Sequence, residues 1–250
     1  MKILVNNNIV NYKDIGDENK PVVVFLHGWL DNLSSFKDME ILQDDFRLIF
    51  IDLPGFGESV IGNKNADLSY YVDCLNDFLK KINVVPYTYV GHSFGGRILI
   101  KGFGLKYLNS KKIILIGSAG IKESISVKNR ILFVCAKILK ILLFPFKKYQ
   151  QKFKNKLYNY IGSDYTKSSE LNNIYKNIIS EDLQKYAKNI SVKTLLIYGD
   201  NDKTTPISYG KLFNKLIKDS RLVIIKDAGH FTHMDKKSEV IDLIKSFLIN

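Results

Sequence analysis

The segment Gly91-His92-Ser93-Phe94-Gly95 limits the fold of this chain more than any other feature. It follows the apolar run 87–90 and opens a stretch with helical spacing, so it predicts a sharp turn from a strand into a helix. A serine at the tip of such a turn needs neighbours without bulky side chains, and the following helix points its N-terminal amides at developing negative charge. The pattern G-x-S-x-G is weak by itself, because glycine and serine often meet by chance in loops. The residues that follow it therefore decide its meaning.

Two candidate partners of Ser93 follow in a definite order along the chain. Asp202 comes after the apolar run 194–198, and His230 comes after the apolar run 221–225. Each would lie just beyond the carboxyl end of a strand, so the three side chains could meet at one edge of a sheet. A serine, a histidine and an acid at hydrogen-bonding distance form the arrangement that activates a serine hydroxyl.

The chain resembles the serine hydrolases of the α/β-hydrolase fold over nearly all of its 250 residues. The order serine, aspartate, histidine, with each residue after a different strand, is the order of that family. The segment His27-Gly28-Trp29 is similar to the family's oxyanion loop, and the segment 52–59 is similar to the loop after the next strand, which we interpret as structural.

This resemblance implies a set of site residues. The expected catalytic residues are Ser93, Asp202 and His230, and the backbone N–H groups of Trp29 and Phe94 are expected to form the oxyanion hole. The substrate pocket is expected to be lined by His27, Trp29, Phe94 and Phe231. We further expect His92 to point into the fold and Arg97 to form a structural ion pair.

Three other residues compete for these roles. Asp200 is the other acid of its loop, but Asp202, four residues before a proline, is favoured. His233 competes with His230 and would otherwise be a supporting or surface group, because the glycine directly before His230 matches the family's last loop. Asp52 is a further acid near the catalytic edge, yet the family's acid follows a later strand.

Short apolar runs alternate with amphipathic stretches, which predicts an α/β fold with a mostly parallel sheet covered on both faces. The predicted elements are a hairpin over 3–12 that turns at 6–8, strands at 22–26, 47–51, 87–90, 112–116, 194–198 and 221–225, and helices at 34–42, 68–82, 94–103 and 238–248. The alternation stops between residues 120 and 182, where the sequence is helical, basic and aromatic. We therefore predict an α/β-hydrolase core domain over 1–120 and 183–250 and an inserted helical cap over 121–182. The segments 161–165 and 179–183 are similar to segments of bacterial α/β-hydrolases whose substrates are mostly unassigned.

The net charge of +12 is concentrated in the predicted cap. Residues 122–156 carry ten lysines or arginines and one acid, Glu123. Because only four of the 37 basic residues are arginine, whose planar fork suits phosphate and base recognition, nucleic-acid binding is not expected. A solvated helix face explains the charge most simply. The apolar run 131–146 with Lys137 and Lys140 keeps weak peripheral contact with an anionic membrane open, as well as attraction of an anionic substrate.

Other features set the compartment and exclude several classes of site. The N-terminus lacks the apolar core of a signal peptide, and no apolar run approaches the ~20 residues that span a bilayer, so a cytoplasmic protein is expected. Cys74 and Cys135 are far apart and show no metal spacing, so we expect reduced thiols. No metal, cofactor or phosphate-binding loop is predicted, and the sequence leaves the oligomeric state open.

The resemblance implies acyl transfer to water through a covalent serine intermediate. Carboxylester hydrolysis with a medium-sized apolar acyl or alcohol group is the favoured reaction, because the predicted cap is aliphatic and aromatic. A carbon–carbon bond hydrolase and a thioesterase use the same three residues and stay open. A ligand sensor with this fold and little turnover is the alternative outside enzymes.

Overall fold

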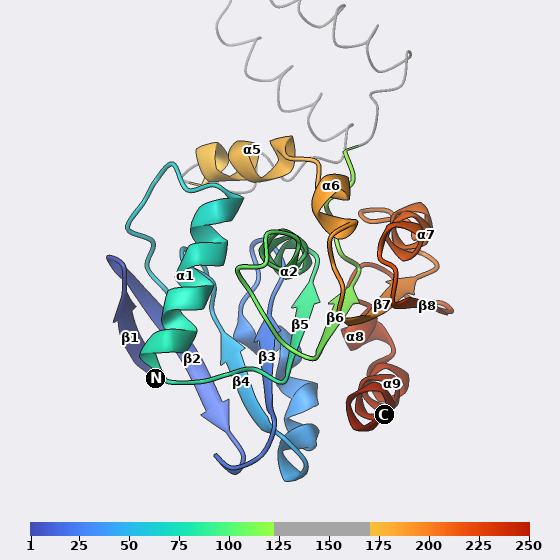
Figure 1. Cartoon of the computed structure of the whole chain (residues 1–250), viewed down its shortest axis with the longest axis horizontal. Helices are drawn as coiled ribbons and strands as arrows, with labels where there is room; N and C mark the ends of the chain where they lie inside the picture. Colours follow the sequence, from blue (N-terminus) through green and yellow to red (C-terminus); the bar gives the residue numbers. More distant parts are fainter. Residues whose placement is uncertain (123–170) are drawn as a thin grey trace, which may run out of the picture.

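The computed structural model describes residues 1–122 and 171–250, which form an eight-stranded sheet with helices on both faces (Figure 1). The strands lie in the order β1-β2-β4-β3-β5-β6-β7-β8. β1, β2 and β4 pair antiparallel, and all pairs from β4 through β3 to β8 are parallel. The strands are β1 Lys2–Val5, β2 Asn8–Ile15, β3 Val22–Leu26, β4 Arg47–Ile51, β5 Thr88–His92, β6 Lys112–Ile116, β7 Lys193–Gly199 and β8 Ser220–Ile225. The predicted fold class, strands and opening hairpin are confirmed.

Parallel strands covered on both faces are expected to be buried along their whole length, and the central strands follow this rule. All five residues of β3 are buried, and so are all five residues of β6. Successive side chains of a strand point to opposite faces. Val24 and Leu26 of β3 accordingly belong to one hydrophobic cluster, and Val23 and Phe25 belong to the other.

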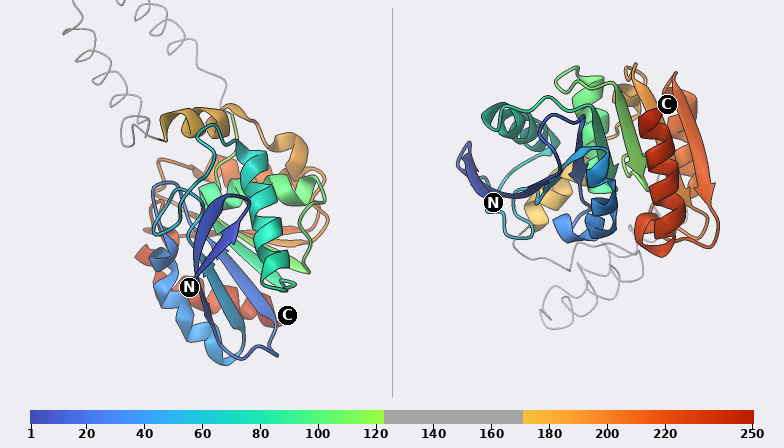
Figure 2. Two further views of the ribbon diagram at one scale, coloured as in Figure 1. Left: turned by 90° about the vertical axis from the view of Figure 1, so that its left-hand side faces the viewer. Right: turned by 90° about the horizontal axis from the view of Figure 1, so that it is seen from below.

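The helices divide between these two clusters. Helices α1, α2, α5, α6 and α7 bury residues in the first cluster, whereas η1 and α9 bury residues in the second, and Figure 2 shows α9 and η1 against the sheet. The bounds are η1 Leu33–Asp44, α1 Leu68–Lys81, α2 Phe94–Gly104, α5 Asn172–Ser180, α6 Gln184–Ala187, α7 Ile207–Leu216, α8 Thr232–Asp235 and α9 Lys237–Ile249. The predicted helices 68–82, 94–103 and 238–248 agree with α1, α2 and α9 within two residues.

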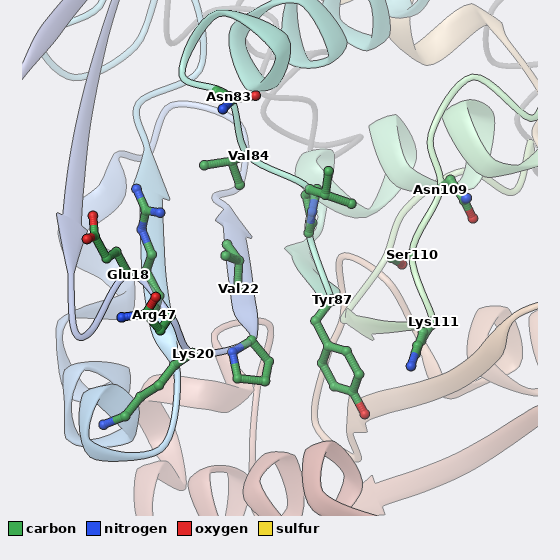
Figure 3. Close-up of a pocket in the computed structure, with 14 residues that line it drawn as sticks. Glu18, Lys20, Val22, Arg47, Asn83, Val84, Tyr87, Asn109, Ser110 and Lys111 are labelled. Atoms are coloured by element: carbon green, nitrogen blue, oxygen red, sulfur yellow. The ribbon is translucent and has the colours of Figure 1, made fainter.

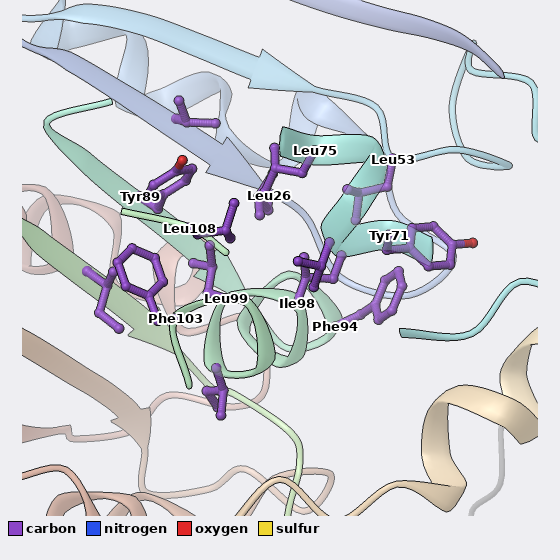
Figure 4. Packing of buried hydrophobic residues seen from close by; sticks show 14 of the residues in the cluster. Leu26, Leu53, Tyr71, Leu75, Tyr89, Phe94, Ile98, Leu99, Phe103 and Leu108 are labelled. Atoms are coloured by element: carbon purple, nitrogen blue, oxygen red, sulfur yellow. The ribbon is translucent and has the colours of Figure 1, made fainter. Parts of the chain in front are cut away.

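Helix α2 lies at the centre of the first cluster, where Leu99 packs near Leu26 and Leu108 (Figure 4). All eleven residues of α2 are buried. Phe94, its first residue, contacts the ring of Tyr71 from α1 at a centroid distance of 4.9 Å. The turn that precedes α2 is therefore supported by packing on every side of the helix that follows it.

The first predicted helix differs from the structure. Residues 33–44 form a 3₁₀ helix that is interrupted at Phe36, where the backbone dihedral angles are not helical. Phe36 is buried and packs against Phe25 of the sheet at 5.3 Å, so tertiary packing outweighs the local helical pattern.

The predicted cap over 121–182 falls mostly on residues 123–170, which lie outside the described residues, as do Cys135 and nearly all of the basic segment 122–156. Of its described end, α5 lies across the carboxyl edge of the sheet above α2 (Figure 1). Cys74 is a free buried thiol, and burial raises its pKa to about 12. Among the described helices, none combines the length and the apolar character needed to cross a bilayer.

Candidate active site

Ser93 lies at the tip of the turn between β5 and α2, as the sequence predicts. Its φ of 47° is in the left-handed region, which side chains other than glycine rarely adopt. The neighbouring glycines allow this turn: a Cβ atom on Gly91 would lie 2.8 Å from the backbone of Gly95, and a Cβ atom on Gly95 would lie 2.2 Å from the carbonyl oxygen of Leu26. The turn therefore stores backbone strain at the serine, which is typical of functional positions.

The structure brings Ser93, His230 and Asp202 together. His230 Nε2 lies 3.0 Å from Ser93 Oγ, and His230 Nδ1 lies 2.8 Å from Asp202 Oδ2. Because a carboxylate can only accept, Nδ1 carries the hydrogen and Nε2 is free to accept the serine hydroxyl. The imidazole is thus held in the tautomer that a general base for Ser93 requires.

The carboxylate of Asp202 is held by three hydrogen bonds from its own loop and by His230. Its Oδ1 accepts the N–H groups of Thr204 at 2.8 Å and Thr205 at 2.9 Å, and its Oδ2 accepts the Thr205 hydroxyl at 2.6 Å. Burial alone would raise the pKa of Asp202, but hydrogen bonds from His230 and Thr205 outweigh it and lower the pKa. The carboxylate is therefore ionised and fixed in place. Sequence reasoning missed Thr205, although a threonine three residues after an aspartate in a loop is a recognisable turn signal.

The three competing residues lie elsewhere. Asp200 accepts the N–H group of Ala228 at 3.3 Å. Asp52 is buried and accepts the backbone N–H groups of Leu33 and Glu58, which supports its interpretation as a structural residue. His233 is 1% exposed and stacks on Phe36 of η1 at 4.8 Å, so the alternative of a surface position was wrong.

The two expected oxyanion donors belong to segments that touch. The N–H group of Gly95 donates to the carbonyl oxygen of His27 at 3.0 Å, which ties the start of α2 to the loop after β3. The rings of Trp29 and Phe94 contact each other at 5.4 Å, and Trp29 also contacts Tyr175 of α5 at 5.2 Å. The role of their backbone N–H groups stays a prediction.

The expected pocket residue His27 has a different position. Its side chain is fully buried, Nδ1 donates to the carbonyl oxygen of Gly28 at 2.7 Å, and Nε2 accepts the N–H group of Leu53 at 2.9 Å. Burial lowers the pKa of His27, so the ring is neutral in this tautomer. His27 therefore joins the loop after β3 to the loop after β4 from the protein interior. Phe231, in contrast, is 42% exposed and lies beside His230 with ring centroids 5.7 Å apart.

Arg97 links helix α2 to the last turn of α5 and to the segment that follows it. Its guanidinium donates to the carbonyl oxygen of Ile178 and, at 2.7 Å, to that of Glu181. Burial lowers the pKa of Arg97 to about 10. The expected ion pair is instead formed by Lys101, whose Nζ lies 2.8 Å from the Glu181 carboxylate. The missed partners are main-chain carbonyl groups, which sequence patterns do not reveal.

Two cavities lie at different edges of the sheet. One of about 740 Å³ begins at Leu30 and Asp31, directly after Trp29, and is closed by Leu171 and Ile174 at α5. Another of about 610 Å³ lies at the amino ends of the strands, where Val22, Arg47 and Tyr87 line it (Figure 3). The first includes Phe56, whose ring contacts Trp29 at a centroid distance of 4.9 Å, but neither cavity is lined by Ser93, Asp202 or His230. Within residues 1–122 and 171–250, no group of three or more histidine, cysteine, aspartate or glutamate side chains could hold a metal ion.

Comparison with known proteins places this arrangement in a family. Residues 17–237 match the protein family described as "Serine aminopeptidase, S33". The chain is 27% identical to the proline iminopeptidase PfmaB of Pestalotiopsis fici, over 98% of this chain and 97% of the relative. It is 26% identical to the pimeloyl-[acyl-carrier protein] methyl ester esterase of Wigglesworthia glossinidia brevipalpis, over 90% of this chain and 93% of the relative. The solved esterase of Exiguobacterium antarcticum has a TM-score of 0.76 and 23% identity, and the match covers 100% of this chain and 99% of the esterase. The chain therefore belongs to this family of hydrolases and is an enzyme of the α/β-hydrolase fold.

Proposed function

We propose that this protein is a serine hydrolase that cleaves carboxylic esters through a covalent acyl-enzyme. The observation that carries the proposal is the relay from Ser93 Oγ through His230 to Asp202, with distances of 3.0 Å and 2.8 Å. These distances lie within the range in which a histidine can take the proton of an attacking hydroxyl group.

In the proposed reaction, Ser93 Oγ attacks the ester carbonyl while His230 Nε2 takes its proton. The tetrahedral intermediate collapses, the C–O bond to the alcohol breaks, and His230 returns the proton to the leaving alcohol. Water then attacks the acyl-enzyme with the same histidine as base and releases the carboxylic acid. Asp202 stabilises the imidazolium in both steps. The backbone N–H groups of Trp29 and Phe94 would bind the negatively charged oxygen, each contributing about 3 kcal/mol.

A medium-sized apolar group suits the surroundings of this site. Phe231 lies beside His230 and Trp29 lies beside Phe94, so both offer aromatic surface near Ser93. The cavity of about 740 Å³, which Phe56 lines next to Trp29, has room for such a group. The segment 121–182 would wall the pocket as a cap. Among named relatives, the similarity to a methyl ester esterase supports ester hydrolysis.

Hydrolysis of the amide bond after an N-terminal residue is the second candidate. The family's description as a serine aminopeptidase and the similarity to a proline iminopeptidase favour it. An amine leaves less readily than an alcohol, so an aminopeptidase would need strict positioning of the substrate's amino terminus. A substrate comparison decides between the two reactions.

The proposal is tested by labelling with a fluorophosphonate probe and by turnover of p-nitrophenyl esters of increasing acyl length. The Ser93→Ala variant is expected to lose labelling and at least about a thousandfold of turnover. Unchanged turnover in Ser93→Ala would refute the assignment. Proline p-nitroanilide, an acyl thioester and a vinylogous diketone complete the panel. Faster turnover of one of these than of every ester would replace carboxylester hydrolysis, and fewer than a few cycles on all of them would favour a ligand sensor.

A further inference from the structure

The side chain of His92 contacts three segments of the candidate site at once. His92 directly precedes Ser93 in the chain and is 1% exposed. Its Nε2 lies 2.9 Å from the backbone carbonyl oxygen of His230. On its other side the ring packs on Gly28, where an added Cβ atom would lie 2.9 Å from His92 Nδ1.

The hydrogen bond to His230 has a definite direction. A carbonyl oxygen only accepts, so His92 Nε2 carries the hydrogen and donates. The ring of His92 lies among other histidines, with centroids 4.8 Å from His230 and 4.8 Å from His233. Burial and these neighbours hold the pKa of His92 well below its usual value, so the ring is neutral and keeps a single N–H group for this bond.

We infer that His92 is a positioning residue that sets the distance between the nucleophile and its base. Ser93 is fixed by the turn, whereas His230 stands in a loop between β8 and α8. The bond from His92 holds the main chain of that loop at residue 230 itself. His92 thus fixes the position of the base relative to the nucleophile. The packing of its ring on Gly28 also fixes the ring relative to the expected oxyanion loop.

The inference rests on the proposed function, and two amide substitutions test it. Glutamine can place its Nε2 donor close to the position of the histidine Nε2, whereas the shorter asparagine cannot reach the carbonyl oxygen of His230. We expect His92→Asn to lower kcat about 10-fold to 100-fold with KM within about threefold of wild type, because a displacement of about 1 Å at a reacting group can cost that much. His92→Gln is expected to recover kcat to within about fivefold of wild type.

Active-site titration with the fluorophosphonate probe gives kcat per competent site, so a loss of folded protein does not imitate the effect. Equal loss of kcat in both variants, or wild-type kcat in His92→Asn, would overturn the inference. Failure of the proposed function is separate, since it would appear as absent labelling and turnover in the wild-type protein.

Gly28→Ala in the otherwise wild-type protein provides a second test that does not require a His92 variant to fold, and an unchanged kcat in it would contradict the inference. Its Cβ atom would press on His92 Nδ1, so it is expected to lower kcat in the wild-type background by displacing the ring. In the His92→Asn background, where the ring is absent, the same change is expected to cost less than about twofold. Independent, multiplicative losses would contradict a shared action through His92.

Discussion

The hydroxyl group of Thr205 donates a 2.6 Å hydrogen bond to the carboxylate of Asp202. The same hydroxyl oxygen lies 3.2 Å from His230 Nδ1 and 3.0 Å from the carbonyl oxygen of Gly117. Thr205 is 1% exposed, so no solvent competes for this bond. The threonine therefore orients the acid of the relay toward its histidine.

Replacement of Thr205 by valine keeps the volume and removes the donor. We expect Thr205→Val to lower kcat/KM about tenfold, because a hydrogen bond to a charged group contributes about 1.5–3 kcal/mol and part of that is lost in orienting Asp202. Steady-state kinetics on a p-nitrophenyl ester measures the effect. Thr205→Ser retains the hydroxyl and should stay within about threefold of wild type. Equal values for valine and serine would show that the hydroxyl group plays no part.

The turn at Ser93 between β5 and α2 depends on a close approach of backbone to backbone. Gly95→Ala would place a Cβ atom 2.2 Å from the carbonyl oxygen of Leu26, which cannot move without shifting β3. We expect a loss of about 3 kcal/mol in the free energy of unfolding, or a fall in Tm of roughly 6–12 °C. Gly229→Ala is the matched control, because its Cβ atom would meet only the flexible end of Asp235, at 3.3 Å. A Tm of Gly95→Ala equal to that of the control would contradict the steric explanation.

Acidification is expected to destabilise the fold through buried histidines. Burial, with a smaller effect of His230, lowers the pKa of His233 from 6.5 to about 4. Above pH 6.5 the ring of His233 is neutral in both the folded protein and the unfolded chain. Between about pH 6.5 and 4 the unfolded chain binds a proton that the folded protein does not, so the free energy of unfolding falls by up to about 3 kcal/mol. Below about pH 4, the pKa of His233 in the folded protein, this stabilisation is fully lost.

Chemical denaturation at several pH values measures this dependence. His233→Phe keeps an aromatic ring against Phe36 and removes the titrating group, so its stability should fall less steeply over the same range. Part of the slope remains in that variant, because burial lowers the pKa of His27 and His92 as well. An identical slope in the variant and the wild type would exclude His233 as the source.

Membrane contact through the basic segment 122–156 stays a prediction from the sequence. Flotation with anionic vesicles at low salt should carry a fraction of the protein upward, and high salt or neutral vesicles should abolish it, because screening weakens attraction to a charged surface. Lys137→Glu/Lys140→Glu is the matched variant and should float less. Protein that remains at the bottom under all conditions would end the lipid hypothesis.

Most of the sheet and the relay residues could be predicted from the sequence, because the signals for them lie in short stretches of the chain. Each strand of the parallel part is a short apolar run, and the polar residue that follows it lies at the common carboxyl edge. Ser93, Asp202 and His230 could be proposed without coordinates because each follows such a run. Their separation along the chain was no obstacle, since parallel pairing brings the ends of distant strands to the same edge.

Features that depend on contacts between loops could not be predicted in this way. His27 resembles a pocket residue by its motif, but its hydrogen bonds to the backbone of Gly28 and Leu53 hold its side chain in the interior behind the loop after β3. The interruption of η1 at Phe36 follows from packing against Phe25 and His233. In both cases one partner, Leu53 for His27 and His233 for Phe36, is distant in sequence and carries no signal in the local pattern.

The attachment of Arg97 uses the main chain of its partners. Its guanidinium binds the carbonyl groups of Ile178 and Glu181, which every amino acid provides. The hydrogen bonds that join α5 and the following segment to α2 therefore do not depend on which side chains positions 178 and 181 carry. Side chains of α5 could therefore change during evolution while the attachment of α5 to α2 is kept.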